Sequence, residues 1–154
     1  MKKFAFALVA AVFALLSEGL CMAQFSKMSI GDYGVESISP DSFTSVNGTV
    51  WIQVGNPMIG FTVSEIRGVV YKKGIPFVQG SAKDFMVPSG NSKVTISGNA
   101  SLCPGASIWS VLGLLFFEPA DYSVDMSMRI TLDSGQTRIV EKKGMPVSEL
   151  LKLK

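Results

Sequence analysis

Two segments of the chain alternate strictly between apolar and polar residues. Val94 to Leu102 has an apolar or small residue at every second position, and Tyr122 to Leu132 repeats this pattern. A period of two puts every apolar side chain of a strand on the same face. One buried and one wet face are typical of antiparallel sheets, because parallel strands are usually buried on both faces. The alternation therefore predicts an antiparallel, all-β domain.

The preceding part of the chain supplies further strands. Residues 50–54 alternate in the same way and stop at Asn56-Pro57, since proline offers no hydrogen-bond donor to a sheet. Residues 60–71 are again extended in character, but their apolar positions change face near Ser64-Glu65. A change of face within one strand predicts a β-bulge at that point.

Turn residues separate the remaining strands. Lys72-Lys73-Gly74 precedes a short strand over residues 75–78, which Pro76 predicts to be an edge strand. Asp133-Ser134-Gly135 predicts a hairpin into a strand over residues 137–141. Short strands with regularly spaced turns are typical of a single β-sandwich.

One segment, Ala106 to Phe117, does not alternate. Several of its apolar residues have helical spacing, and the segment is apolar almost all round. One interpretation is a short buried crossover with helical character at one end of the sandwich. The other is a partner-binding or lipid-facing patch, since an exposed apolar surface of this kind needs an explanation. The residues of this patch would be Trp109, Leu112, Leu115 and Phe116.

The N-terminus predicts a signal peptide over residues 1–23. Two lysines precede the apolar run Phe4 to Leu16, which is shorter than the roughly 20 residues that a membrane-spanning helix needs. Cleavage after Ala23 would leave residues 24–154 as a single domain, exported to the periplasm or secreted. The alternative is a lipidated Cys21 and an outer-membrane lipoprotein, although Leu20 is large for the position before such a cysteine.

Composition argues against most kinds of chemistry. The chain has no histidine, which removes the commonest general base and the commonest metal ligand. Its formal net charge of +2 is too small for a nucleic-acid-binding surface. After cleavage Cys103 would be the one remaining cysteine, so neither a disulfide nor a zinc site is expected. We therefore predict no catalytic, cofactor-binding or metal-binding residues and no enzymatic activity.

The stretch from Val35 to Pro57 resembles the opening of the LEA type 2 family, also called the water-stress and hypersensitive-response (WHy) domain. Later blocks are also similar, around Val87-Pro88 and in the hairpin from Tyr122 to Val140. The positions that match the family pattern are Asn56, Pro57, Tyr71, Gly74 and Gly80. The resemblance implies an immunoglobulin-like or fibronectin-III-like β-sandwich without a catalytic centre, and an association with dehydration and stress.

Two hypotheses for the function follow. The first is an exported stress-protective or protein-interaction module, whose partner the sequence does not identify. The alternative is a cell-envelope accessory subunit or a carrier of a lipid or another apolar ligand, which would use residues 106–117. Neither hypothesis involves nucleic acid, and neither needs a transmembrane segment in the mature chain.

Overall fold

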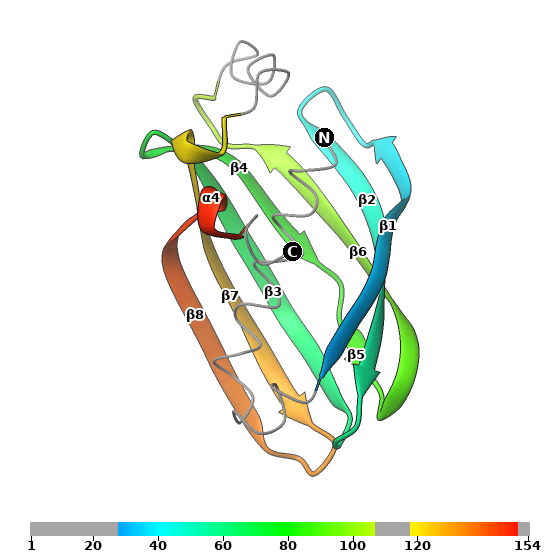
Figure 1. Ribbon diagram of the computed structural model, residues 1–154. Coiled ribbons are helices and arrows are strands. Elements are labelled where there is room, and N and C mark those ends of the chain that lie inside the picture. The colour runs from blue at the N-terminus through cyan, green and yellow to red at the C-terminus, as the bar shows by residue number, and fades with distance from the viewer. Residues whose placement is uncertain (1–27, 107–117, 151–154) are drawn as a thin grey trace.

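The computed structural model describes residues 28–106 and 118–150 (Figure 1). The predicted signal peptide, Cys21 and the predicted patch of Trp109, Leu112, Leu115 and Phe116 lie outside these residues. The described elements are β1 (Ser29–Pro40), β2 (Ser45–Asn56), β3 (Phe61–Lys72), β4 (Ile75–Ala82), β5 (Phe85–Val87), β6 (Gly90–Leu102), the 3₁₀ helix η2 (Pro119–Asp121), β7 (Tyr122–Leu132), β8 (Thr137–Pro146) and the short helix α4 (Val147–Leu150).

The eight described strands form one antiparallel sheet. Seven of them follow the order β1-β2-β6-β4-β3-β7-β8, and the short β5 pairs with the first residues of β3, ahead of the part of β3 that pairs with β4. The sheet is strongly curved, so that β1 and β2 at one end and β7 and β8 at the other enclose a concave inner face (Figure 1). The prediction of an all-β antiparallel fold with sandwich character is confirmed.

The two alternating segments become β6 and β7, and their apolar residues lie on the inner face. In β7 the residues from Tyr122 to Ile130 are alternately buried and half-buried. The predicted bulge is also present, because the register between β3 and β7 shifts between Ser64 and Arg67. Glu65 has a φ of 52° there, and its carboxylate forms an ion pair with Arg129 at 3.0 Å.

The prediction that Pro76 confines its strand to an edge is wrong. β4 lies in the middle of the sheet, between β6 and β3, and runs on to Ala82. Proline is tolerated because the pairing of β4 with β6 begins only at Val78, so that no donor is required at Pro76 on that side. Two further differences are β5, which the sequence did not indicate, and β8, which continues to Pro146 instead of ending at Glu141.

The lower part of the inner face, as seen in Figure 1, holds a tightly packed core. Its side chains are at most 2% exposed and come from strands across the sheet: Ile52, Val54, Phe61, Val63, Val87, Met128 and Ile130. Burial of one such side chain is worth about 1.5–3 kcal/mol relative to leaving it in water. We call this region the packed end.

Candidate apolar binding site

Towards the other end, the inner face of the sheet is built from small residues. We call six of them the small-residue floor: Gly48, Gly68, Gly80, Ala82, Gly98 and Ala100. Gly48 lies opposite Gly98, and Gly98 lies opposite Ala82, so these three form one row across β2, β6 and β4. The other three form the next row across β6, β4 and β3. Directly opposed residues share a face of the sheet, so the floor presents almost no side-chain volume to the inside.

Two of the glycines are required by the close approach of β4 and β6. A Cβ atom at Gly80 would lie 2.8 Å from the carbonyl oxygen of Asn99, and one at Gly98 would lie 2.7 Å from that of Ser81. Real Cβ atoms do not approach backbone atoms so closely, so the curvature of the sheet excludes any side chain here. Gly48 differs, since the atom nearest to its Cβ position is 3.8 Å away. Gly80 and Gly98 therefore cannot be replaced by larger residues without a shift of the backbone, whereas Gly48 has space for a side chain.

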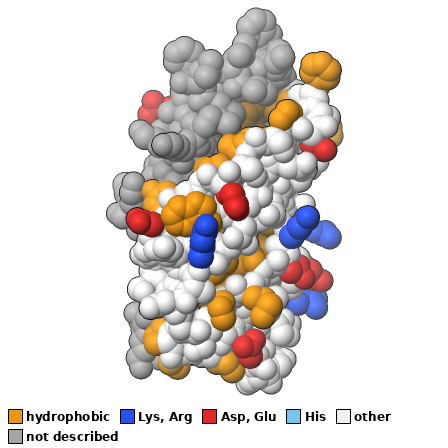
Figure 2. All heavy atoms as spheres, turned by 90° about the vertical axis from the view of Figure 1, so that its right-hand side faces the viewer, with side chains coloured by type: hydrophobic (Ala, Val, Ile, Leu, Met, Phe, Trp, Pro, Cys, Tyr) orange, Lys and Arg blue, Asp and Glu red, His pale blue; other side chains and the backbone are white. Residues whose placement is uncertain are grey.

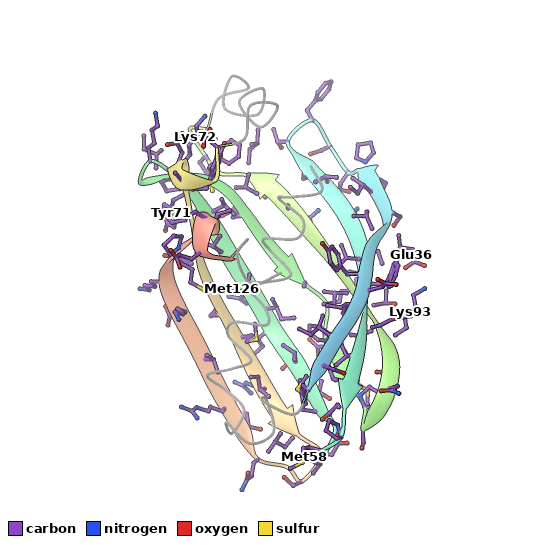
Figure 3. All side chains as sticks on the ribbon, in the orientation of Figure 1. Glu36, Met58, Tyr71, Lys72, Lys93 and Met126 are labelled. Carbon is purple, nitrogen blue, oxygen red and sulfur yellow. The ribbon has the colours of Figure 1, made fainter. Side chains whose placement is uncertain are left out.

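Above this floor lies a hollow with a volume of about 460 Å³. Its walls include Ile66, Val70, Ile96 and Val124 of β3, β6 and β7, with Met126 near the centre of the concave face (Figure 3). None of the described residues that line the hollow carries a charge. Most of these described residues are apolar or glycine, as in many small-molecule sites.

The rim of the hollow along β1 is apolar and faces solvent. Val35 and Ile38 line the hollow from β1, and their side chains are 41% and 55% exposed. Phe43, in the turn between β1 and β2, also lines it and is fully exposed. Glu36 and Lys93, by contrast, point away from the concave face (Figure 3). The hollow thus opens past an apolar rim, with these charged groups on the outside of the sheet.

A second depression, of about 430 Å³, lies on the outer face behind the same floor and has a polar lining. Three of its charged groups, those of Asp125, Glu141 and Lys143, are engaged within the protein. The carboxylate of Asp125 accepts a hydrogen bond from the N–H of Gly144 at 2.8 Å, and Lys143 forms an ion pair with Glu141 at 3.6 Å. Because three of the four charged residues that line this depression already have partners, we regard the inner hollow as the better candidate site.

The residues predicted from the family resemblance are dispersed over the fold. Asn56 is buried at the end of β2, where its side chain accepts a hydrogen bond from the N–H of Met58 and donates one to the carbonyl of Ile59. This bonding fixes the turn that includes Pro57. Tyr71 is half-buried near the end of β3, and Gly74 has a φ of 80° in the β3–β4 turn. Only Gly80 lies at the hollow, as part of its floor.

Cys103 follows β6 at the hollow end and is buried. Burial raises the pKa of its thiol, so the reactive thiolate is disfavoured. The described Cys, Asp and Glu residues do not come together in a group of three that could hold a metal ion. Within the two described stretches, no helix is long and apolar enough to cross a membrane.

Comparison with known proteins gives only distant structural likenesses. No protein-family profile and no curated protein matches the chain. The crystal structure of a protein from Archaeoglobus fulgidus matches 75% of this chain and 94% of its own length, with 11% identity and a TM-score of 0.47. A Northeast Structural Genomics Consortium target matches 76% of this chain and 83% of its own length, with 12% identity and a TM-score of 0.33. Neither likeness carries an argument about function.

Proposed function

We propose that the protein is a non-catalytic carrier that binds a single aliphatic chain, such as the tail of a lipid, in the inner hollow. The observation that carries this proposal is a hollow of about 460 Å³ above the small-residue floor, whose described lining residues carry no charge. Protein interiors are normally packed without voids much larger than a water molecule. A hollow of this size also falls within the usual range of ligand sites, about 300–1,000 Å³.

The volume supports one chain of moderate length. At about 30 Å³ per water-sized group, roughly the size of a methylene, a hollow of about 460 Å³ holds about 15 such groups. Each buried methylene contributes about 0.8 kcal/mol, so even partial filling supports useful affinity. An ionised group inside the hollow would find no charged partner among the described lining residues, and such burial is costly. We therefore expect the polar head of the ligand to stay outside.

The predicted export of the chain fits this function, because lipids must cross the aqueous spaces of the envelope on a carrier. Export itself stays a prediction from residues 1–23. The sequence-based alternative placed the apolar ligand against residues 106–117, whereas this proposal rests on the described inner face.

A direct test uses the neutral apolar dye N-phenyl-1-naphthylamine, whose fluorescence rises in an apolar environment. The purified protein should bind one dye molecule per chain, and long-chain alcohols should displace it. Gly48→Val places a branched side chain in the hollow at the one floor glycine whose Cβ position is shown to be open. Loss of space for two or three methylenes should weaken binding by about 10- to 100-fold.

The matched control is Gln53→Val, which also introduces a valine into β2 but at an exposed position on the outer face. It should leave dye binding unchanged, and both variants should keep the melting temperature of the wild type within a few degrees. Absence of dye binding by the wild type, or equal loss in both variants, would reject the carrier function.

The stress-protective module remains a prediction that depends on the outer face. There, hydroxyl and amide groups pair with one another across strands, as in the contacts between Thr49 and Ser97 at 3.0 Å and between Asn99 and Asn47 at 2.8 Å. Protection of a labile enzyme during drying, compared with an unrelated immunoglobulin-like domain at equal mass, tests that alternative.

A further inference from the structure

The turn between β1 and β2 holds an aromatic side chain out into solvent. The N–H groups of Asp41 and Ser42 both donate to the carbonyl of Ser45, at 3.0 and 3.2 Å. The hydroxyl of Ser45 donates to the carboxylate of Asp41 at 3.0 Å. The turn is thus fixed by polar contacts that do not involve the side chain of Phe43, which is fully exposed. Its exposure is therefore not needed for the shape of the turn.

This hairpin tip is also attached to the wall of the hollow. The N–H of Leu102 in β6 donates to the carbonyl of Thr44 at 2.8 Å, and both residues line the hollow. From Phe43 the apolar rim continues along β1 through Ile38 to Val35. In the space-filling view, hydrophobic side chains reach the surface at this upper end of the molecule (Figure 2). The exposed apolar side chains of Phe43, Ile38 and Val35 thus all border the hollow on the side of the tip.

The charge of the β1–β2 hairpin itself indicates what kind of surface its tip fits. Between Met28 and Asn56 the chain contains Asp32, Glu36 and Asp41 but no lysine or arginine. Proteins that bind anionic membranes do so through clusters of basic residues. An acidic hairpin with an apolar tip is suited to a surface without net negative charge.

Resting on the proposed function, we infer that the hairpin tip inserts into a neutral lipid bilayer and that the ligand enters the hollow there. The ligand is an apolar chain, and a bilayer is the medium in which such chains are held. A single exposed apolar side chain is ordinary on a protein surface. What distinguishes Phe43 is that it lines the hollow itself, so that a tail leaving the bilayer beside it can pass along Ile38 and Val35 into the hollow.

Vesicles of phosphatidylcholine test this inference through co-sedimentation with the full chain. Phe43→Ala should weaken association about tenfold or more, because insertion of a phenylalanine ring contributes most of the apolar area at the tip. Ile139→Ala is the matched control, since Ile139 is 65% exposed on β8 at the opposite edge of the sheet. This control should associate like the wild type. Phe43→Trp should associate with the vesicles like the wild type. The fluorescence emission of the added tryptophan should shift to shorter wavelength on association.

Three results would overturn the docking inference. These are equal losses for Phe43→Ala and Ile139→Ala, stronger association when phosphatidylglycerol replaces part of the phosphatidylcholine, or a dimer in solution that Phe43→Ala converts to a monomer. The last would mean that the tip contacts a second copy of the chain. The dye titration without vesicles separates the two proposals. A wild type that binds no dye rejects the carrier function, whereas normal dye binding with no effect of Phe43→Ala on vesicle association rejects only the docking.

Discussion

The packed end and the hollow end of the inner face are made from the same strands but differ in side-chain volume. In β2, Val54 is 2% exposed at the packed end, whereas Val46, on the same face, is only half-buried at the hollow end. In β6 the same face changes from Val94, which is 3% exposed, to the half-buried Ala100. On these two strands, one end is tightly packed and the other leaves space beside the hollow. On β2 and β6 the alternation of apolar and polar residues is the same at both ends, so that here the two ends differ in side-chain size.

The largest expected effect on stability comes from shortening a valine of β2 to alanine at each end of the inner face. Val54→Ala should cost about 2–3 kcal/mol of unfolding free energy, because it removes two buried methyl groups and leaves a cavity. Val46→Ala should cost less than about 1 kcal/mol, since its surroundings are already partly open. Urea unfolding with an unchanged m-value measures both. Equal costs would mean that the two ends are packed alike.

A smaller effect should distinguish two glycines of the small-residue floor. Gly98→Ala should destabilise the fold by about 1–3 kcal/mol, because its Cβ would press on the carbonyl of Ser81. Gly48→Ala should be neutral or stabilising by up to about 1 kcal/mol, since alanine restricts the unfolded chain and meets no close atom here. Thermal unfolding of the two variants provides the comparison. Tolerance of alanine at Gly98 would show that the curvature of the sheet does not depend on this glycine.

The smallest effect is a pH dependence that arises at the hollow end. Burial raises the pKa of Cys103, and burial together with the negative charge of Asp121 raises that of Tyr122. The folded state therefore keeps both protons at a pH where the unfolded chain has begun to lose them. Stability should then fall as the pH rises above about 8.5 for the thiol and about 10 for the phenol.

The variants Cys103→Ser and Tyr122→Phe isolate these contributions. The urea midpoint of the wild type should fall between about pH 7.5 and about pH 10.5. Cys103→Ser should reduce the fall that begins near pH 8.5, and Tyr122→Phe should reduce the fall that begins near pH 10. A midpoint in the wild type that rises with pH over this interval would contradict the assignment. Cys103→Ser should also leave dye binding intact, because Cys103 does not line the hollow.

The fold class could be predicted from the sequence because strand alternation is a local property. The pattern from Tyr122 to Leu132 places its buried residues correctly, and the change of face near Glu65 locates the bulge. The position of β4 could not be predicted, since the neighbours of a strand depend on pairings that are distant in the sequence. Pro76 was misjudged because its consequence depends on where the pairing with β6 begins.

The candidate site was missed for a related reason. Gly98 and Ala100 belong to the alternating segment that forms β6, and Gly68 and Gly80 lie in β3 and β4. Each small residue is unremarkable by itself, and the hollow exists only because the register brings them together. A signal was nevertheless present, since glycine at the inward position of four strands is unusual where large apolar residues are favoured.

The two glycines that tolerate no Cβ have a consequence for how such a site can evolve. Gly80 and Gly98 hold the depth of the hollow constant, because any side chain there would disturb the backbone of the neighbouring strand. Gly48, whose Cβ position is open, and Ala82 and Ala100, which already carry a Cβ, line the same hollow. Successive substitutions at these three positions would shorten the space one or two carbons at a time. Selectivity for chain length could thus drift while the architecture stays unchanged.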